Sequence, residues 1–354
     1  MPPAAPKPFP DAPAFRKALL AWFSRHQRPM PWRTEVSAYR TVVSELMCQQ
    51  TQVATAIPYF ERWTARWPDF ASLAKAKEAD VLAAWAGLGY YTRARNLLAL
   101  AQQVAGRPEP RTAEAWRAFK GVGPYTAAAI ASIAYREPVA VVDGNVVRVL
   151  ARVAGVRDRF KDTGAAAKRF APLAAALVDP KHPGDFNQAM MELGATVCRK
   201  AAPACARCPV AKWCDARRRG DAAGLPRFEA KVRRTDEVTR GLVRHDGRVL
   251  LHRLPQDARR LAGMAELPTI AMLGAVARGQ PDMVRRRTIG NVTYEERLHA
   301  WPVTAAEVRR WTRDPALEWV DEVSLDAAAL TGPHRRWLRE WLSPAGRTTR
   351  GRRP

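Results

Sequence analysis

Four of the chain's five cysteines lie in one short segment, with the spacing Cys198-x6-Cys205-x2-Cys208-x5-Cys214. Four thiolates this close in sequence converge on one centre only if the chain wraps around it, and such crowding indicates metal rather than disulfide bridges. All-thiolate zinc sites usually consist of two C-x2-C pairs. The longer gaps here favour a four-iron cluster and leave zinc as the alternative. Cys48 stands apart on an apolar helix face, where we expect a buried small hydrophobe.

A tight turn, Gly121-Val122-Gly123, lies between two segments with helical spacing. The backbone N–H groups of such a turn, together with the N-terminus of the helix that follows, can hold a phosphate without reading sequence. Taken alone, an ordinary helix–helix turn explains the same residues about equally well.

Two carboxyl side chains are candidates for acid–base or electrostatic catalysis. Asp143 stands at the start of an apolar helical segment, where an Asp is most often a helix N-cap, and local evidence favours that interpretation. Glu45 is flanked by VVS and LMC, and these mostly apolar neighbours argue against a residue on an exposed helix surface.

A helical framework must position these side chains. Between residues 12 and 215 apolar residues recur at helical spacing, with Gly and Pro between the segments. From about residue 236 short alternating runs appear, and VTRGLVRHDGRVLLHRL predicts two strands joined at His245-Asp246-Gly247. We expect AELPTIAML, a mixed helical stretch, a strand in VTYEERLHAWPV and a closing helix in GPHRRWLREWL to follow.

The pattern predicts a mainly α protein with two domains. A helical domain covers residues 1–217, a basic linker 218–235, a smaller α+β domain 236–343 and a disordered basic tail 344–354. The net charge of +24 favours a polyanionic partner, although a compositional bias toward Arg would also produce it. Neither a signal peptide nor a membrane-spanning segment is evident, so we expect a soluble cytoplasmic protein without a membrane partner, nucleoid-associated if bacterial.

Several motifs in sequence order resemble those of the MutY-type adenine DNA glycosylases, which are helix-hairpin-helix enzymes with an iron–sulfur cluster. The motifs are Pro31-Trp32-Arg33, residues 44–53 (SELMCQQTQV), Gly87-Leu88-Gly89-Tyr90-Tyr91, the turn at 121–123, Val142-Asp143-Gly144-Asn145-Val146, residues 186–191 (FNQAMM) and the four cysteines. The resemblance covers roughly residues 15–215. It implies a two-lobed glycosylase domain, with a six-helix barrel at about 28–135 and a cluster lobe formed by 12–27 and 136–217.

The resemblance also implies catalytic roles for Glu45, Asp143, Tyr125 and Asn145. Glu45 would protonate adenine N7 as a general acid, and Asp143 would stay ionised to stabilise the oxocarbenium-like sugar. Tyr125 stands where bifunctional relatives carry a Lys that forms a Schiff base, so we expect a monofunctional enzyme. The four cysteines would hold a [4Fe-4S] cluster.

Further residues are expected to contact the base or the duplex, although each could instead serve packing. Trp32, Arg33 and Gln188 would line the base pocket. Gln49, Gln50 and Tyr90 would lie near the partner base of the flipped adenine. The remaining DNA-binding candidates are Leu88, Gly121, Val122, Gly123, Thr293 and Tyr294.

The second domain resembles the Nudix-like domain of the same enzymes through residues 261–268 (LAGMAELP), with Ala265 where Trp is usual. The acidic helix of a Nudix hydrolase is absent from the sequence, so we expect no pyrophosphate hydrolysis. The family reads 8-oxoguanine through a Phe-Ser-His segment, and Asn291-Val292-Thr293-Tyr294 stands in its place. The sequence leaves open whether guanine is accepted as readily or whether Tyr294 reads the lesion.

These features predict a monofunctional DNA glycosylase that removes adenine mispaired with 8-oxoguanine or guanine in base excision repair. The alternatives are a related glycosylase with another base choice, such as thymine opposite guanine, and a non-catalytic DNA-binding protein. Its partner would be double-stranded DNA containing a mismatched adenine. Nothing in the sequence indicates an obligate protein partner, and we expect a monomer.

Overall fold

The structure is a computed structural model that describes residues 11–343 except 231, 232, 256, 259, 260, 262, 278 and 327. The expected basic tail therefore lies outside the described residues, as do Ala262 and the first ten residues. The described chain forms two compact units, one from residues of 1–84 and 92–230 and one from residues of 85–91 and 231–354. None of the helices in the described part of the chain is long and apolar enough to cross a membrane.

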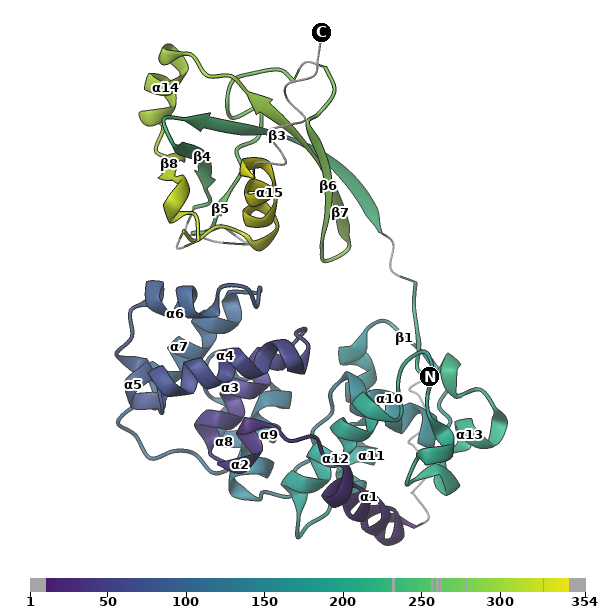
Figure 1. The fold of residues 1–354 in the computed structure, drawn as a ribbon. Coiled ribbons are helices and arrows are strands. Elements are labelled where there is room, and N and C mark those ends of the chain that lie inside the picture. Colours follow the sequence, from purple (N-terminus) through teal and green to yellow (C-terminus); the bar gives the residue numbers. More distant parts are fainter. Residues whose placement is uncertain are drawn as a thin grey trace. The chain divides into compact units, whose positions relative to one another are not determined.

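The first unit is built almost entirely of helices (Figure 1). Two short strands, β1 (Arg159–Phe160) and β2 (Arg227–Phe228), pair in parallel within it. Its helices, with α6 running into the segment 85–91, are α1 (Ala12–His26), α2 (Pro31–Thr34), α3 (Ala38–Cys48), α4 (Val53–Arg66), α5 (Phe70–Ala74), α6 (Glu78–Trp85), α7 (Thr92–Val104), α8 (Ala113–Arg117), α9 (Pro124–Tyr135), α10 (Gly144–Val153), α11 (Thr163–Leu177), α12 (Pro183–Thr196) and α13 (Asp215–Arg219).

Several of these helices begin where the sequence supplies a capping side chain. Ser37 accepts a hydrogen bond from a first-turn N–H of α3, Asp143 does so for α10 and Asp162 for α11. A side-chain oxygen at this position satisfies one of the backbone donors that the helix itself leaves without a partner. The caps therefore fix the points at which α3 and α10 start.

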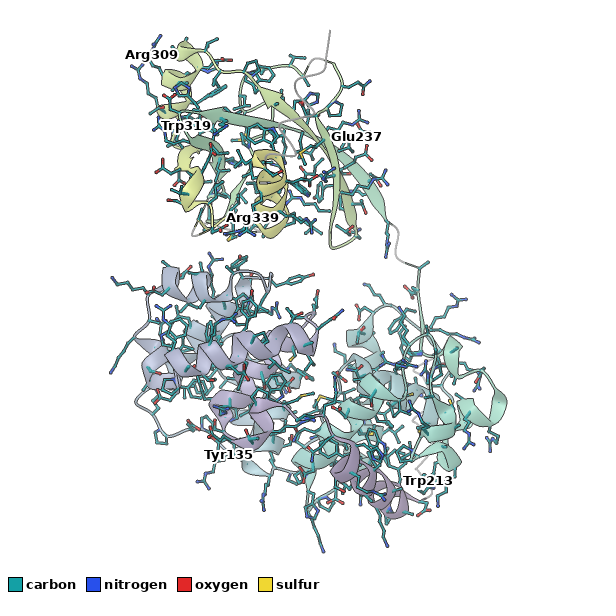
Figure 2. All side chains as sticks on the ribbon, viewed as in Figure 1. Tyr135, Trp213, Glu237, Arg309, Trp319 and Arg339 are labelled. Carbon is teal, nitrogen blue, oxygen red and sulfur yellow. The ribbon has the colours of Figure 1, made fainter. Side chains whose placement is uncertain are left out.

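One apolar core joins the N-terminal helix to α10, α11 and α12. Phe15 and Leu19 of α1 are fully buried in it, with Leu150 of α10 and Phe170 of α11. Trp213 lies in the cysteine-rich segment (Figure 2). It packs edge-on against Phe15, with ring centroids 5.6 Å apart. The chain around the cysteines thus shares a core with the first helix.

A second group of buried aromatic rings holds α3, α4, α5 and α8 together. Tyr39 donates a hydrogen bond to the Trp67 carbonyl and accepts one from Trp63 Nε1 at 3.1 Å. Phe70 packs edge-on against Tyr39, with 5.1 Å between ring centroids, and also contacts Trp116. The buried hydroxyl of Tyr39 and the indole N–H of Trp63 are thereby paired.

Two glycines let α12 approach its neighbours closely. A Cβ on Gly184 would lie 2.8 Å from the Ser132 carbonyl oxygen of α9, and one on Gly194 would lie 2.6 Å from Cβ of Asn145 on α10. Such distances are too short for a real side chain. Glycine at both positions sets α12 directly against the two helices whose first turns carry Tyr125 and Asn145.

The second unit is an α+β fold around one sheet with strand order β5-β4-β3-β7-β6 and β8 beside β4. The strands β3 and β7 run parallel, and the other pairs are antiparallel. Trp337, Leu338 and Trp341 of α15 are buried in its core. The elements are β3 (Arg234–His245), β4 (Arg248–Arg253), β5 (Ala265–Glu266), β6 (Met283–Ile289), β7 (Val292–Trp301), α14 (Ala305–Thr312), β8 (Leu317–Asp321) and α15 (Gly332–Leu342).

The predicted hairpin, the strand at β7 and the closing helix α15 are confirmed. Asp246 and Gly247 both have positive φ, at 44° and 71°, between paired His245 and Arg248, as a two-residue turn between twisted strands requires. The mixed helical stretch expected before β7 is wrong, because the described residues between β5 and β7 contain no helix and residues 283–289 form β6. Arginines occupy both faces of β6, so the alternation that marks a strand is hidden in its sequence.

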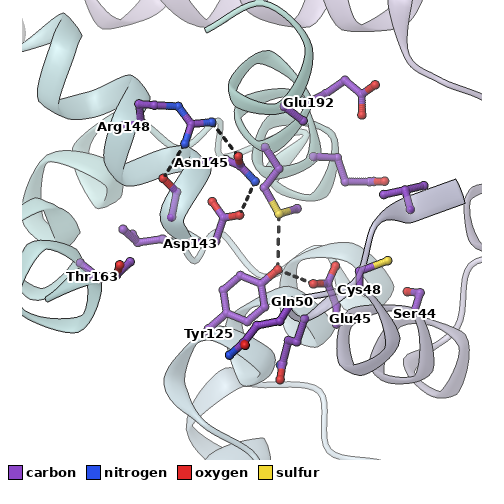
Figure 3. Close-up of a pocket in the computed structure, with 18 of the residues that line it drawn as sticks. Ser44, Glu45, Cys48, Gln50, Tyr125, Asp143, Asn145, Arg148, Thr163 and Glu192 are labelled. Atoms are coloured by element: carbon purple, nitrogen blue, oxygen red, sulfur yellow. Dashed lines mark hydrogen bonds between the residues drawn. The ribbon is translucent and has the colours of Figure 1, made fainter. Parts of the chain in front are cut away.

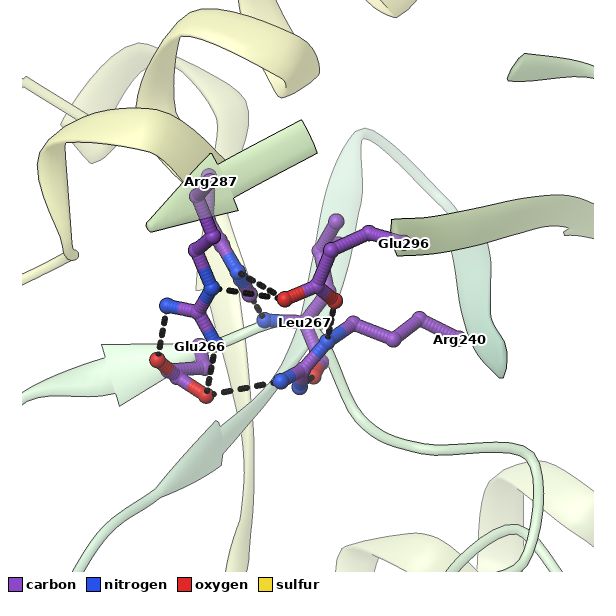
Figure 4. A network of polar contacts seen from close by, with 6 residues as sticks. Arg240, Glu266, Leu267, Arg287 and Glu296 are labelled. Carbon is purple, nitrogen blue, oxygen red and sulfur yellow. Dashed lines mark hydrogen bonds and ion pairs between the residues drawn. The ribbon is translucent and has the colours of Figure 1, made fainter. Parts of the chain in front are cut away.

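A buried network of alternating charges ties β3, β5, β6 and β7 together (Figure 4). Arg240 pairs with Glu296 and, at 2.9 Å, with Glu266, while Arg287 binds both carboxylates at 2.6 Å. Each of these side chains is at most 10% exposed. Burial raises the pKa of Glu266, but the hydrogen bond from Arg287 and the charge of Arg240 hold it below its ordinary value. The four charges sum to zero, which limits the cost of their desolvation.

Candidate active site

A cavity of about 1220 Å³ opens within the first unit (Figure 3). Its walls come from α2, α3, α9, α10, α11 and α12, with the segment 223–228 closing one side. The sequence-predicted residues that line it are Trp32, Arg33, Glu45, Gln49, Gln50, Tyr125, Asp143, Asn145 and Gln188. Residues far apart in the chain are thus brought to one hollow.

Glu45 and Tyr125 meet in this cavity. Glu45 lies in the last turn of α3 and Tyr125 in the first turn of α9, and the phenol donates a hydrogen bond to Glu45 Oε2. Burial raises the pKa of Glu45 to about 7, helped by the charge of Asp143 and opposed by the Tyr125 hydrogen bond. A carboxyl group with this pKa carries a proton near neutral pH and can deliver it.

Burial also raises the pKa of Tyr125 well above its ordinary value, and the charge of Glu45 acts in the same direction. Tyr125 therefore stays a neutral donor. Its oxygen lies 3.6 Å from Met191 Sδ on the other side. The phenol serves here to hold the Glu45 carboxyl in place.

Asp143 is both the N-cap of α10 and a wall of the cavity. Its Oδ1 accepts a hydrogen bond from Val146 N at 2.7 Å, and its Oδ2 accepts one from Asn145 Nδ2 at 2.8 Å. Burial raises the pKa of Asp143, while these hydrogen bonds act against the rise. Because both oxygens act as acceptors, the arrangement suits the ionised carboxylate. The N-cap interpretation and a place in the cavity are therefore compatible.

Two neighbours fix Asp143 further. Asn145 accepts a hydrogen bond from Arg148 Nη2 at 2.8 Å, which turns the amide nitrogen of Asn145 toward Asp143 (Figure 3). Asn187 of α12 is buried and binds Val139 O at 2.8 Å and Val141 N at 3.0 Å. The strand-like segment that leads into Asp143 is thereby held to α12.

A polar group on α12 and α2 forms another wall of the cavity. Arg33 Nε donates to Gln188 Oε1 at 3.0 Å, and its Nη2 lies 3.0 Å from Glu192 Oε2. Glu192 also pairs with Arg28 at 2.6 Å. Arg33 thereby fixes which end of the Gln188 amide is the oxygen, and the amide nitrogen of Gln188 can act only as a donor.

The turn at 121–123 joins α8 to α9 and does not line the cavity. Gly121 has a φ of +90°, which favours glycine, and Gly123 is the N-cap of α9 without a side-chain cap. The first N–H groups of α9 are thus available to an external acceptor such as a phosphate. Val122 is buried, so only the two glycines of the turn are exposed.

Two further residues predicted from the sequence, Leu88 and Tyr90, are not among the described residues that line the cavity. Tyr90 is 62% exposed with a φ of 48°. Gln50, at the cavity rim, is exposed with a φ of 56°. Left-handed backbone is uncommon for residues other than glycine and is found most often at turns and functional sites.

Thr293 and Tyr294 belong to β7 of the second unit and point to opposite faces of the sheet. Thr293 Oγ1 lies 3.2 Å from Thr288 Oγ1 of β6, whereas the Tyr294 ring faces the guanidinium of Arg287 at 5.6 Å. Successive strand residues always alternate in this way. A single base can therefore contact only one of the two.

The four clustered cysteines line one small separate cavity together with Arg152. Arg152 is buried and its Nη1 lies 3.2 Å from Cys198 Sγ, so a cation stands beside the thiol set. Among the residues that the structure describes, no group of three or more His, Cys, Asp or Glu side chains is arranged to hold a metal ion. Burial raises the pKa of Cys48, which lines the large cavity, to about 12.

Sequence reasoning missed several residues of the site. Arg148 orients Asn145, and Arg152 binds the carbonyl oxygens of Cys198, Arg199 and Lys200. Both arginines interrupt the apolar run VVRVLARV of α10, and a charge within an apolar helix is the signal that could have found them. No comparable signal marks the segment 223–228, which is held beside the cavity by the pairing of β2 with β1 and by the hydrogen bond from Arg152 to the Leu225 carbonyl.

The comparisons with known proteins agree on one family. A family model described as HhH-GPD superfamily base excision DNA repair protein matches residues 43–174. The adenine DNA glycosylase of Homo sapiens is 48% identical over 218 residues, which cover 58% of this chain and 40% of the human protein. That of Mycobacterium tuberculosis is 41% identical over 231 residues, which cover 63% of this chain and 75% of the relative.

The structure is similar to that of a thermostable thymine-DNA glycosylase, with a TM-score of 0.51 and 25% identity over 59% of this chain and 97% of the other. The chain spans 40% to 50% of the length of several eukaryotic relatives that it matches.

Proposed function

Since the chain belongs to the family of adenine DNA glycosylases, we propose that it hydrolyses the N-glycosidic bond of adenine mispaired with 8-oxoguanine or guanine, in base excision repair. One observation carries the proposal. Glu45 and Asp143 line the same cavity. Glu45 has a pKa of about 7 and lies beside a neutral donor, Tyr125. Asp143 accepts a hydrogen bond at each of its two oxygens. Two carboxyl groups held in different protonation states are what glycoside hydrolysis requires.

The chemistry follows from these environments. A base inside a duplex is out of reach, so the nucleotide must be flipped into the cavity at a cost of roughly a few kcal/mol. Glu45 then gives its proton to adenine N7, and the C1′–N9 bond breaks with its electron pair leaving on the base. The Asp143 carboxylate stabilises the positive charge that develops on the sugar until water adds at C1′.

Tyr125 supports a monofunctional reaction. Its hydroxyl is held by Glu45 and stays protonated, and a phenol cannot form the Schiff base that lysine forms with a sugar aldehyde. Asn145 takes part by donating to Asp143. The product is an abasic site in an intact strand.

Double-stranded DNA with a mismatched adenine is the proposed partner, bound by a monomer. The turn at 121–123 offers the uncapped N-terminus of α9 to a phosphate, and the net charge of +24 favours a polyanion. Trp32, Arg33 and Gln188 would contact the flipped base, since all three line the cavity. Exposed Gln50, with Gln49, would contact the duplex around the vacated position. Exposed Tyr90 would also contact the duplex, whereas Leu88 is 6% exposed and offers it little surface.

For the second unit we propose a Nudix-like domain at 236–343 that reads the base opposite adenine. Of the expected linker at 218–235, residues 218–230 belong to the first unit. Either Thr293 or Tyr294 would contact the base opposite adenine, since the two face opposite sides of β7. An experimental structure of the full chain bound to mismatched DNA tests the fold and identifies the reading residue.

We propose that Cys198, Cys205, Cys208 and Cys214 hold a [4Fe-4S] cluster. The donor set fits, because the four thiols line one cavity and the Arg152 guanidinium beside Cys198 would offset their negative charge. When bound, the cluster would pin the loop that follows α12. We expect about four iron atoms per chain and broad visible absorption in protein purified without oxygen, whereas one zinc per chain would contradict the assignment.

Base release from four duplexes tests the proposed function. The duplexes carry adenine opposite 8-oxoguanine, guanine or cytosine, and thymine opposite guanine, and each product is analysed with and without alkali. We expect strand breaks at adenine opposite 8-oxoguanine or guanine, visible only after alkali. Breaks without alkali that borohydride traps as a covalent adduct would refute the monofunctional reaction. Thymine release would move the function to the mismatch glycosylases, and tight binding without release would indicate a non-catalytic protein.

A further inference from the structure

Helix α7 contributes no residue to the cavity walls, yet its first turn contacts the helix that carries Glu45. Arg93 is 8% exposed, and its Nη1 lies 2.6 Å from the Leu46 carbonyl oxygen and 3.2 Å from that of Met47. The same nitrogen donates to the Gln49 carbonyl, and Nη2 lies 3.5 Å from Thr51 Oγ1. One guanidinium thus binds both the end of α3 and the turn that follows it.

These carbonyls are the ones that a helix leaves without a partner. The last four C=O groups of α3 have no N–H ahead of them in the helix, and they form its negative end. A buried cation at this point satisfies the oxygens and complements their dipoles. Glu45 lies in this last turn, where its carbonyl accepts the capping N–H of Gln49 at 3.1 Å.

The same face of α7 also supports the turn at 121–123. A Cβ on Gly121 would lie 3.1 Å from Asn96 Cβ, and Gln103 Oε1 accepts a hydrogen bond from Lys120 N at 3.3 Å. Arg93, Asn96 and Gln103 are spaced three and seven residues apart, which places them on one side of the helix. One helix face therefore braces both α3 and the turn that starts α9, the two helices whose side chains meet in the Glu45–Tyr125 hydrogen bond.

We infer that Arg93 is a positioning residue for the reaction, whose guanidinium holds the last turn of α3 and so keeps the Glu45 carboxyl in the geometry that base release needs. The expected kinetic effect rests on the proposed function, whereas the contact between Arg93 and α3 is independent of it. Arginine suits the position because its planar fork presents several donors at once. Lysine would keep the positive charge but would lack the second nitrogen that reaches Thr51 Oγ1.

The test compares Arg93→Met, Arg93→Lys and the control Arg95→Met in the full-length chain. Arg95 lies on the same helix and pairs at the surface with Glu78 at 2.7 Å. Single-turnover adenine release is measured with enzyme in excess, which gives the rate constant. The fraction of enzyme that is active is measured separately. The rate constant per active molecule is expected to fall about 10- to 100-fold in Arg93→Met, since displacements near 1 Å have such effects. Arg93→Lys should recover part of it, and Arg95→Met should match the wild type.

Amide hydrogen exchange at residues 46–51 is the second readout and needs no activity. We expect faster exchange there in Arg93→Met and not in Arg95→Met. A normal rate constant in a smaller active fraction would overturn the inference, because Arg93 would then serve stability alone. If the wild type itself released no adenine, the proposed function would fail, and unchanged exchange would then still show separately that Arg93 does not hold the turn.

Discussion

An Asp143→Asn variant is expected to fold and bind mismatched DNA while losing base release. Asn is as good an N-cap as Asp, and its amide oxygen can still accept the Val146 N–H that Asp143 accepts now. The lost features are the negative charge facing the sugar and the oxygen that accepts the hydrogen bond from Asn145 Nδ2. Removing a group that stabilises developing charge slows such reactions by about 10²- to 10³-fold, and we expect at least that reduction in the single-turnover rate constant.

The matched control is Asp69→Asn, because Asp69 caps α5 with a 2.7 Å hydrogen bond from Ser72 N and is not among the residues that line the cavity. Both variants exchange a capping carboxylate for an amide. Equal thermal midpoints with activity lost only at position 143 would assign the effect to chemistry. A fully active Asp143→Asn enzyme would show that the reacting sugar lies elsewhere.

A Glu45→Gln variant is expected to lose about 10²- to 10⁴-fold in base release, the usual contribution of a general acid. Gln retains an oxygen that can accept the Tyr125 hydrogen bond, so the geometry is kept while the proton is lost. In the wild type the rate should fall as pH rises through about 7, where Glu45 loses its proton. The residual activity of Glu45→Gln should not show this fall in rate with rising pH. The control variant Glu61→Gln, changed at an exposed residue of α4, should show the same fall as the wild type.

The same substitution has an opposite effect on stability. The pKa of Glu45 rises from 4.5 in the unfolded chain to about 7 in the folded protein, so between these values the folded state binds more protons. Stability therefore falls as pH rises through this window, and above it the full cost of the buried charge is present. Glu45→Gln should melt at a higher temperature than the wild type at pH 8 and show a smaller difference at pH 5. A variant that melts lower at pH 8 would contradict the burial of an ionised carboxylate.

Local signals in the sequence predicted a good part of the molecule. Asp143 before an apolar run predicted a cap and is one, and His245-Asp246-Gly247 predicted the hairpin between β3 and β4. These predictions succeed because capping and tight turns depend on a few adjacent residues. The family motifs placed nine side chains that the fold then gathers around one cavity.

Contacts between distant segments could not be predicted in this way. Nothing near Tyr125 in sequence indicates that its hydroxyl meets Glu45, because the contact depends on how α9 packs against α3. Arg93 follows a recognised motif, yet its partners are backbone oxygens of another helix. Every residue has a backbone carbonyl, so a residue pattern cannot indicate such partners. In β6, arginines on both faces concealed the strand, and the buried Arg287 is tolerated on the inner face because Glu266 and Glu296 of other strands neutralise it.

The hairpin of β6 and β7 has a two-residue turn, Gly290-Asn291, between paired Ile289 and Val292. On β7 a hydroxyl at Thr293 and an aromatic ring at Tyr294 stand one residue apart and face opposite ways. A single-codon insertion that lengthened the turn and shifted β7 by one position would exchange the two, because every side chain of a strand changes face with a one-residue slip. Within this lineage, indels at the turn would offer a route by which the side chain presented to a partner base changes without any substitution in the strand itself.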